Sequence, residues 1–314
     1  MTPVRGRFAP SPTGALHLGG ARTALVAWLS VRARGGTLVL RMEDLDAERA
    51  RAGAAEALLE DLRWLGLEWD EGSDAGGAHG PYTQGERRAR YAAAAEELRA
   101  AGLAYPCWCT RAELARAASA PHAGEAGPRY PGTCRGAAPR AGRAALRLAV
   151  PAGVVSFDDL VRGPVAQDVA REVGDYVLVR ADGCAAYQLA VALDDSDMDI
   201  TEVVRADDLL DSTPRQLQLL ALLGRAAPRY AHVPMVLNAD GVRLAKRDGG
   251  AQVAALRAAG RAADEIVGWL AASLGLVPAG TRARPHQLVR AFAEKSGGGL
   301  AWLAQPPTRF TALL

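Results

Sequence analysis

The chain has 314 residues, a formal net charge of +2, 49% hydrophobic residues and 23% charged residues, which is the composition of an ordinary globular protein. Its length allows one large or two modest domains, and its near-neutral charge excludes a nucleic-acid coat over the whole surface. No stretch reaches the ~20 apolar residues of a membrane span, and "MTPVRGRFAP" lacks the apolar core of a signal peptide. We therefore expect a cytoplasmic protein with no membrane partner, and a monomer because no coiled-coil or swapping element is evident.

The opening segment predicts an extended strand that runs into a helix. "GRFAPSPTGALHLGG", from Gly6 to Gly20, is rich in proline and glycine, and apolar residues at helical spacing follow it as far as Arg34. Gly35 and Gly36 end that helix, and "TLVLRMEDLD" begins as a second short apolar strand. A strand, a helix and a strand within about forty residues are typical of a βαβ unit, so we expect the α/β class with a parallel sheet.

The rest of the chain predicts further helices and strands. Helices are expected at 54–65 and 84–101, a surface loop at 73–80, and strands at 144–150, 175–180 and 185–195. "STPRQLQLLALLG" predicts a helix with Ser212 as its N-cap and Pro214 in its first turn. A strand, an Asn-Ala-Asp-Gly turn and a lysine-bearing loop follow, and the segment from Gln252 onward is expected to be mostly helical.

The segment from Tyr105 to Gly142 departs from this alternation and is interpreted as an insertion between two halves of a sheet domain. It holds three of the four cysteines and many prolines and glycines. From Arg111 to Arg147 there are seven arginines against two acids. Such a patch can bind phosphates, and a solvated basic face is an equally good interpretation.

His17, Gly19 and Gly20 stand where the first strand is expected to meet its helix. The N-terminus of a helix presents N–H groups and the positive end of its dipole to an anion, and glycines let a phosphate approach the backbone. His17 could donate a hydrogen bond to a phosphate in a transition state. The spacing differs from the G-x-G-x-x-G pattern, so by itself it leaves a phosphate-binding turn and a packed connection as alternatives.

"RFAPSPTGALHLGGARTAL" followed by "LRMEDLD" resembles the glutamyl branch of the class I aminoacyl-tRNA synthetases. The resemblance implies that His17 is catalytic and holds the ATP phosphates together with Gly19 and Gly20. It also implies that Glu43 binds the amino group of the substrate glutamate. The substrate itself would be held by the "RFAPS" stretch, namely Arg7, Phe8, Ala9, Pro10 and Ser11. These roles suit the residue types, since arginine pairs bidentately with a carboxylate and a carboxylate accepts hydrogen bonds from an ammonium group.

The second half of the chain continues the resemblance. "GPYTQGERRARY", "AAYQLAVALDD" and "TEVVRADDLLDSTPRQ" are similar to segments of the same family. The resemblance implies that Tyr187 and Arg205 complete the amino-acid pocket. Arg205 facing the side-chain carboxylate would select glutamate over glutamine, because an uncharged amide cannot form the same charge pair. A core aromatic residue is the alternative interpretation of Tyr187.

"VRLAKRDGG" takes the place of the family's K-L-S-K or K-M-S-K loop. The resemblance implies ATP contacts from Arg243, Leu244 and Lys246, with Lys246 catalytic and with Mg²⁺ accompanying the nucleotide. Arg243 keeps a positive charge but changes its geometry, and Ala245 removes a hydroxyl group. We expect activity to survive because Lys246 is present, and the rate is left open.

Cys107, Cys109 and Cys134 form a set that suits one structural, tetrahedral zinc ion. From chemistry alone His122 is the fourth ligand, because imidazole binds zinc more often than phenol does. The glutamyl-queuosine tRNA(Asp) synthetases instead carry C-x-C followed by Y-x-x-x-C, which "YPGTC" matches, and we favour Tyr130 with His122 as the rival. Cys184 is expected to be a small buried residue.

About sixty residues follow Gln252, too few for the anticodon-reading part of a full glutamyl-tRNA synthetase. The chain therefore resembles the glutamyl-queuosine subgroup. That resemblance implies activation of L-glutamate by ATP without tRNA, and transfer of glutamate to the cyclopentenediol of queuosine in the anticodon of tRNA(Asp). The alternatives are a compact synthetase that charges tRNA(Glu), and a non-catalytic descendant that binds tRNA or an amino acid.

We expect four units. These are the first half of a Rossmann-type catalytic domain at 1–104, a zinc-binding insertion at 105–150, the second half with the ATP loop at 151–250, and a helical C-terminal region at 251–314.

Overall fold

A five-stranded parallel sheet forms the centre of the computed structural model, which describes residues 4–45, 52–110, 112–114, 129–238, 240–242, 244, 251–297 and 299–310. In spatial order its strands are β10 (Arg229–Val233), β9 (Glu202–Ala206), β1 (Arg5–Phe8), β2 (Thr37–Leu40) and β3 (Glu71–Gly72). β1 pairs with both β2 and β9, so the two halves of the chain meet at the middle of the sheet. The predicted α/β class with a parallel sheet is confirmed.

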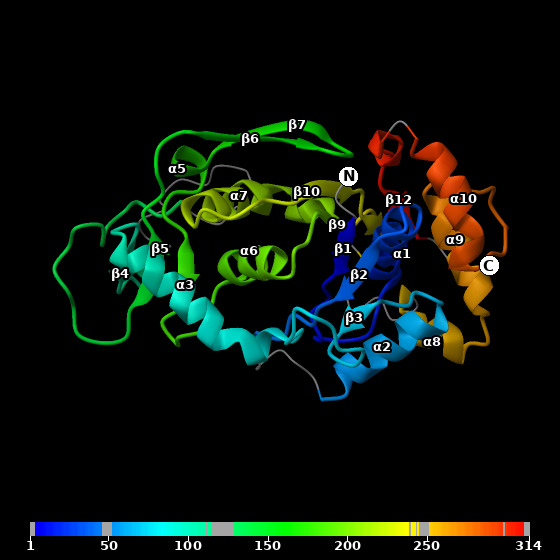
Figure 1. Ribbon diagram of the computed structural model, residues 1–314, viewed down its shortest axis with the longest axis horizontal. Helices are drawn as coiled ribbons and strands as arrows, with labels where there is room; N and C mark the ends of the chain where they lie inside the picture. The colour runs from blue at the N-terminus through cyan, green and yellow to red at the C-terminus, as the bar shows by residue number, and fades with distance from the viewer. Residues whose placement is uncertain are drawn as a thin grey trace.

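The helix α1 (Leu18–Arg32) connects β1 to β2 and is buried on nearly all sides. One side packs on the sheet, and the other meets α9 (Ala263–Ser273) and α10 (Pro285–Lys295) (Figure 1). α1 ends before a left-handed turn at Gly35, while a Cβ atom on Gly36 would lie 2.1 Å from the carbonyl oxygen of Val4. The prediction that Gly35 and Gly36 end the helix is therefore confirmed. The tight turn into β2 leaves no room for a side chain at position 36.

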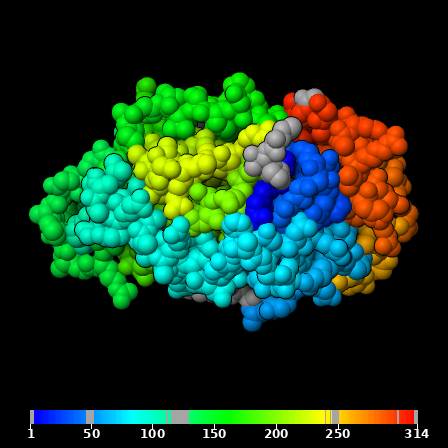
Figure 2. Space-filling view, viewed as in Figure 1, coloured from blue at the N-terminus to red at the C-terminus, as the bar shows by residue number. Residues whose placement is uncertain are grey.

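The C-terminal part of the chain is mostly helical, as predicted, with α8 (Val253–Ala258) preceding α9 and α10. These helices form one end of the elongated molecule, coloured orange to red in Figure 2. The short strand β12 (Thr308–Arg309) returns to pair with β11 (Val236–Leu237), and η4 (Ala301–Leu303) precedes it. The first half contributes α2 (Ala54–Trp64) near α8 (Figure 1).

A three-stranded antiparallel sheet lies at the opposite end of the molecule (Figure 1). It contains β4 (Ala104–Cys107), β5 (Ala145–Leu148) and β8 (Val177–Val179), in the order β4-β5-β8. Between β5 and β8 the chain forms a hairpin of β6 (Val154–Asp159) and β7 (Gly163–Asp168), followed by the short helix α5 (Val169–Glu172). The helix predicted at 84–101 begins as the 3-10 helix η1 (Gln84–Arg87) and continues as α3 (Arg88–Ala100).

The strand predicted at 185–195 is wrong, because this segment forms the helix α6 (Tyr187–Asp197). Its apolar run from Leu189 to Leu193 is entirely buried. An unbroken apolar run looks alike in a buried helix and a buried strand, so periodicity could not separate the two.

The helix α7 (Thr213–Leu222) begins where the sequence predicted, with Ser212 at the N-cap and a proline in its first turn. The Ser212 hydroxyl does not cap the helix, however, because the 3-10 helix η2 (Asp207–Ser212) gives that residue a helical backbone. It instead accepts a hydrogen bond from the side-chain amide of Gln188, at 3.0 Å, and so links α7 to α6.

None of the helices within the described ranges is long and apolar enough to cross a membrane.

Candidate functional site

A cavity of about 400 Å³ opens at the carboxyl ends of β1 and β9, beside the N-terminus of α1. This is the edge of a parallel sheet where ligands bind in α/β proteins. Of the described residues that the sequence predicted for glutamate or ATP, all line this cavity except Leu244 of the ATP loop. These lining residues are Arg7, Phe8, Ala9, Pro10, Ser11, His17, Gly19, Gly20, Glu43, Tyr187 and Arg205.

His17 is the N-cap of α1, and its Nδ1 atom accepts a hydrogen bond from the backbone N–H of Gly20 at 3.1 Å. Since Nδ1 accepts, the ring proton of the neutral imidazole is on Nε2, which makes Nε2 a donor suited to an anion. A Cβ atom on Gly19 would lie 3.0 Å from Nδ1 of His17. The glycine at position 19 therefore leaves room for the imidazole as well as for a ligand.

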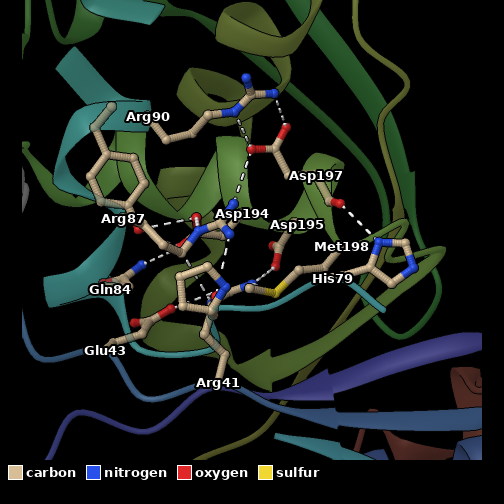
Figure 3. A network of polar contacts seen from close by, with 12 residues as sticks. Arg41, Glu43, His79, Gln84, Arg87, Arg90, Asp194, Asp195, Asp197 and Met198 are labelled. Atoms are coloured by element: carbon tan, nitrogen blue, oxygen red, sulfur yellow. Dashed lines mark hydrogen bonds and ion pairs between the residues drawn. The ribbon is translucent and has the colours of Figure 1, made fainter. Parts of the chain in front are cut away.

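Arg7 is held by a carboxylate from the second half of the chain. Its Nε donates to Oδ1 of Asp195 at 3.2 Å, and a terminal nitrogen donates to the carbonyl of Val204 at 3.2 Å. Arg41 donates to the same Asp195 oxygen at 2.7 Å and to Glu43 at 3.1 Å (Figure 3). Burial alone would raise the pKa of Asp195, but Arg7 and Arg41 outweigh it and hold the pKa below its usual value.

Glu43 lies beside these arginines with its side chain almost fully buried. Burial raises the pKa of its carboxyl group, and the opposing effects of Arg41 and Arg7 do not cancel that rise. A buried carboxylate with a raised pKa gains from a further cation, so an ammonium group in the cavity would stabilise its charged form. This environment agrees with the amino-group contact predicted for Glu43.

Asp194 and Asp195 are neighbours on α6 but hold different parts of the first half. Asp194 accepts from the side-chain amide of Gln84 at 2.8 Å and from Arg87 at 2.6 Å, whereas Asp195 contacts Arg41 (Figure 3). Asp195 also accepts from Arg7. Two successive residues of one helix thus join η1 and the central strands.

Arg205, on β9, is only 4% exposed and is held by neutral groups. Its Nε donates to Nε2 of His232 at 2.9 Å, and its terminal nitrogens donate to Gln216 at 2.8 Å and to Thr213 at 2.7 Å. The guanidinium also lies 5.1 Å from the ring centre of Tyr230. Within the described part of the chain Arg205 has no ion pair with a carboxylate, and two of its five N–H donors have no hydrogen-bond partner.

Tyr187 is the first residue of α6 and is 37% exposed where it borders the cavity. Tyr187 is therefore not enclosed on all sides by the core. Leu244 does not line the cavity, because it is buried and its backbone N–H meets the carbonyl of Val236 at 3.3 Å. The other predicted loop residues, Arg243, Ala245 and Lys246, lie outside the described residues.

The sequence did not predict the residues that hold the two arginines. Asp195 holds Arg7 and is shared with Arg41, whereas Thr213, Gln216 and His232 hold Arg205. Arg41 could have been found from its position two residues before Glu43, since such residues share a face in extended chain. The others carried no local signal.

Cys107, Cys109 and Cys134 place their sulfur atoms within 4.8 Å of one another, and the sulfurs of Cys109 and Cys134 are 3.5 Å apart. The hydroxyl of Tyr130 lies 3.4 Å from the sulfur of Cys107 and 3.7 Å from that of Cys109. Ligand sulfurs around a tetrahedral zinc ion lie about 3.8 Å apart, given Zn–S bonds of about 2.3 Å. The cluster therefore could hold a metal ion, and the Tyr130 oxygen stands at the position of a fourth ligand.

The surroundings shift the pKa values of this cluster in opposite directions, because burial raises the pKa of Cys109 to about 11 and also raises that of Tyr130. Burial raises the pKa of the Cys134 thiol, but hydrogen bonds from the Trp108 backbone, Tyr130 and the other two cysteines outweigh it and set the pKa at about 7. The guanidinium of Arg147 lies 3.9 Å from the ring centre of Tyr130. The rival ligand His122 lies outside the described residues. Cys184 stands apart and is only half-buried, with its sulfur 3.3 Å from the carbonyl of Leu45.

The basic patch predicted between 111 and 147 is partly used inside the protein. Arg147 is buried and donates to the backbone carbonyl of Asp175, and Arg135 pairs with the carboxylate of that same residue at 2.7 Å. Arg140 lies 3.7 Å from Glu113. Of the described arginines in this stretch, only Arg147 is removed from solvent, and Arg135 and Arg140 remain about half exposed.

Comparison with known proteins identifies the fold and family. Residues 3–281 match the model of the catalytic domain of class I tRNA synthetases (E and Q). The chain is 49% identical to a glutamyl-Q tRNA(Asp) synthetase of Symbiobacterium thermophilum, over 98% of this chain and 96% of the relative. It is 50% identical to one of Nitratidesulfovibrio vulgaris, over 88% and 87%.

Among solved structures, a glutamate tRNA ligase from Elizabethkingia meningosepticum in complex with its amino acid is similar with a TM-score of 0.78. It is 27% identical, and the match covers 99% of this chain and 67% of the other. The chain therefore belongs to the class I tRNA synthetases of the glutamate and glutamine type and is a ligase of the aminoacyl-tRNA synthetase type.

Proposed function

We propose that the cavity binds L-glutamate and ATP and that the enzyme forms glutamyl-adenylate without tRNA. The observation that carries this proposal is Arg205, a buried cation that lines the cavity and contacts no carboxylate within the described ranges. A buried charge without a counter-ion is costly, so the site favours a ligand that brings an anion to that place. The side-chain carboxylate of glutamate does so, and the amide of glutamine does not.

The remaining cavity residues suit the rest of the substrate. Glu43 accepts from the α-ammonium group of glutamate, and Tyr187 and the "RFAPS" stretch (Arg7, Phe8, Ala9, Pro10 and Ser11) enclose the amino acid. The α-carboxylate then points toward His17 and the N-terminus of α1, where ATP binds on Gly19 and Gly20.

In the activation step, an oxygen of the α-carboxylate attacks the α-phosphorus of ATP. An O–P bond to glutamate forms, the bond to the β-phosphate oxygen breaks, and pyrophosphate leaves. The Nε2–H of His17 and the N–H groups at the start of α1 stabilise negative charge on the phosphates, and the substrates are held in line for attack. Mg²⁺ bound with ATP, together with Arg243, Leu244 and Lys246 of the ATP loop, completes this part of the proposal.

For the second step we propose transfer to queuosine in tRNA(Asp). The names of relatives at 49% and 50% identity support it. A hydroxyl of the cyclopentenediol attacks the activated carbonyl carbon, an ester bond forms, and AMP leaves with the electrons of the broken bond. The rival acceptor is the terminal adenosine of tRNA(Glu), as in a compact glutamate tRNA ligase.

The proposed function is tested first by glutamate-dependent exchange of pyrophosphate into ATP in the absence of tRNA. Exchange is expected with glutamate and not with glutamine, and the lack of any exchange would reject activation and favour a non-catalytic binder. Labelled glutamate and ATP are then given to bulk tRNA from cells that make queuosine and from cells that lack it. Label only in the first, on tRNA(Asp), supports the modifying reaction, whereas equal label in both, on tRNA(Glu), supports the rival.

We also propose that residues 105–150 form a zinc-binding insertion, with Cys107, Cys109, Tyr130 and Cys134 as ligands of one structural ion. The positions of the three sulfur atoms and of the Tyr130 hydroxyl support it. Elemental analysis of the purified protein is expected to give one zinc per chain. Cys134→Ser should lose that metal, while Cys184→Ser, outside the cluster, should keep it. Zinc retained by the Cys134 variant would contradict the assignment.

A further inference from the structure

A buried aspartate–histidine pair lies directly behind Arg205 and outside the cavity lining. His232, on β10, has no exposed surface, and Asp159, the last residue of β6, is 4% exposed. Nδ1 of His232 lies 2.6 Å from Oδ2 of Asp159, and Nε2 of His232 lies 2.9 Å from Nε of Arg205. The three side chains form a continuous row from the β6–β7 turn to the cavity.

The chemistry of Arg205 determines where the proton of His232 is. The Nε–H of an arginine can only donate, so Nε2 of His232 must accept and the imidazole proton must be on Nδ1. That proton is donated to Asp159. His232 is therefore neutral, with one fixed tautomer, and it offers Arg205 a lone pair.

Asp159 is in turn held by the backbone. Its other carboxylate oxygen accepts from the N–H groups of Val161 at 3.0 Å, Arg162 at 2.9 Å and His232 at 3.2 Å. Three backbone donors fix the plane of the carboxylate and direct Oδ2 at the imidazole. The orientation of the Arg205 guanidinium thus depends on the main chain of the β6–β7 turn.

We propose that Asp159 and His232 are positioning residues that fix the guanidinium plane of Arg205 for the side-chain carboxylate of glutamate. The inference rests on the proposed function, in which Arg205 receives that carboxylate. A neutral acceptor orients Arg205 without placing a carboxylate against it, so its charge is left for the substrate. Thr213 and Gln216 are neutral acceptors of the same guanidinium and serve the same end.

Two amide variants separate the two hydrogen bonds of His232. His232→Gln places a carbonyl oxygen near the position of Nε2 and keeps an acceptor for Arg205. His232→Asn places an amide N–H near the position of Nδ1, which keeps the contact with Asp159 and removes the acceptor. We expect His232→Asn to raise the KM for glutamate roughly ten-fold or more, because it removes a hydrogen bond to a charged group. His232→Gln should stay within about three-fold of wild type, on the same reasoning, and neither variant should change the KM for ATP.

Asp159→Asn tests the tautomer. Three backbone donors keep the amide oxygen of the new side chain at the turn, so its NH₂ group faces Nδ1 of His232 and draws the histidine proton to Nε2. Nε2–H would then oppose the Nε–H of Arg205. We expect a rise in the KM for glutamate at least as large as in His232→Asn, and weaker discrimination between glutamate and glutamine.

The measurements are pyrophosphate exchange kinetics, thermal unfolding of each variant, and nitrogen NMR of the His232 ring in the wild-type protein. Equal glutamate KM values for the two His232 variants, in an active wild type, would overturn the positioning role and leave the proposed function intact. A wild type without glutamate-dependent exchange would overturn both. If the variants fail to fold, the NMR spectrum decides, because protonation on Nε2 contradicts the inference and protonation on Nδ1 supports it.

Discussion

The cavity contains two buried arginines that are held in opposite ways. Arg7 donates to the carboxylate of Asp195, which Arg41 shares, so its charge is balanced inside the protein. Arg205 donates to His232, Gln216 and Thr213, all of them neutral. The same residue type thus pairs directly with a carboxylate at one place and contacts only neutral groups at the other.

The difference assigns the two arginines different tasks. A carboxylate that approaches Arg7 must compete with Asp195, whereas one that approaches Arg205 meets no such competitor in the described part of the chain. In the proposed function, we therefore expect charge selectivity for the substrate to depend more on Arg205 than on Arg7.

The largest effect is expected from Arg205→Gln, which removes the guanidinium that has no carboxylate in direct contact within the described part of the chain. We expect kcat/KM for glutamate in pyrophosphate exchange to fall roughly 10³-fold or more, because a site built for a charged partner discriminates strongly when that pairing is lost. Arg205→Lys, which keeps the charge but not the planar fork, should fall between this variant and the wild type. An unchanged kcat/KM for glutamate in Arg205→Gln would contradict a contact between Arg205 and the substrate.

Asp195→Asn disrupts the ion-pair network that Asp195 forms with Arg7 and Arg41. It leaves Arg7 and Arg41 buried without their shared carboxylate, and we expect the free energy of unfolding in urea to fall by about 3 kcal/mol. Glu96→Gln is the matched control, since it removes one partner of an exposed ion pair with Arg99, and little change is expected. Equal stabilities of the two variants would show that the buried network does not hold the pocket together.

Gly19→Ala tests whether a change at the ATP end of the cavity alters ATP binding without altering glutamate binding. The added Cβ would press on His17 at 3.0 Å and shift its ring by a few tenths of an ångström. We expect the KM for ATP to rise roughly ten-fold, because small misplacements of a catalytic group are costly, while the KM for glutamate stays unchanged. A matched rise in both values would contradict this separation.

The smallest effect concerns a second buried aspartate, Asp61, which contrasts with Asp195. Burial raises the pKa of Asp61 to about 6, although Arg257 at 3.5 Å opposes the rise. Because this folded-state pKa exceeds the unfolded value of 3.8, the associated stability is fully present below that value and is lost as pH rises through about 6.

Asp61→Asn removes this titration. The difference in unfolding free energy, variant minus wild type, should be larger at pH 8 than at pH 4. The increase should be on the order of 1 kcal/mol. Thermal unfolding of both proteins across that range checks it. A constant difference between the two proteins at all pH values would contradict the raised pKa.

The sequence predicted those parts of the fold that glycine and proline delimit. The unit formed by β1, α1 and β2 followed from the proline-rich opening and from Gly35 and Gly36. α6 was missed because its apolar residues are buried on every side, so no helical periodicity remained to be read.

The candidate site likewise contains residues that the sequence predicted and residues that it did not. Eleven of the 22 lining residues were predicted, from motifs that resemble the family, and of the described residues predicted for the substrates only Leu244 lies outside the cavity lining. Thr213 and Gln216 are only 8 and 11 residues from Arg205, but the pairing of Arg7 with Asp195 spans 188 residues and was not predictable from local sequence. Asp159 is 73 residues from His232, and Arg41 is 154 residues from Asp195. A single sequence does not record such pairings.

The contact between Arg7 and Asp195 joins residues 188 positions apart, and this separation bears on how the enzyme is made. Synthesis proceeds from the N-terminus at about 5–20 residues per second, so Arg7 leaves the ribosome well before its counter-ion exists. The cavity can close only after Asp195, Arg205 and His232 have been added. A nascent chain that stops earlier carries unbalanced guanidinium groups and an open sheet, which makes it a substrate for chaperones and proteases.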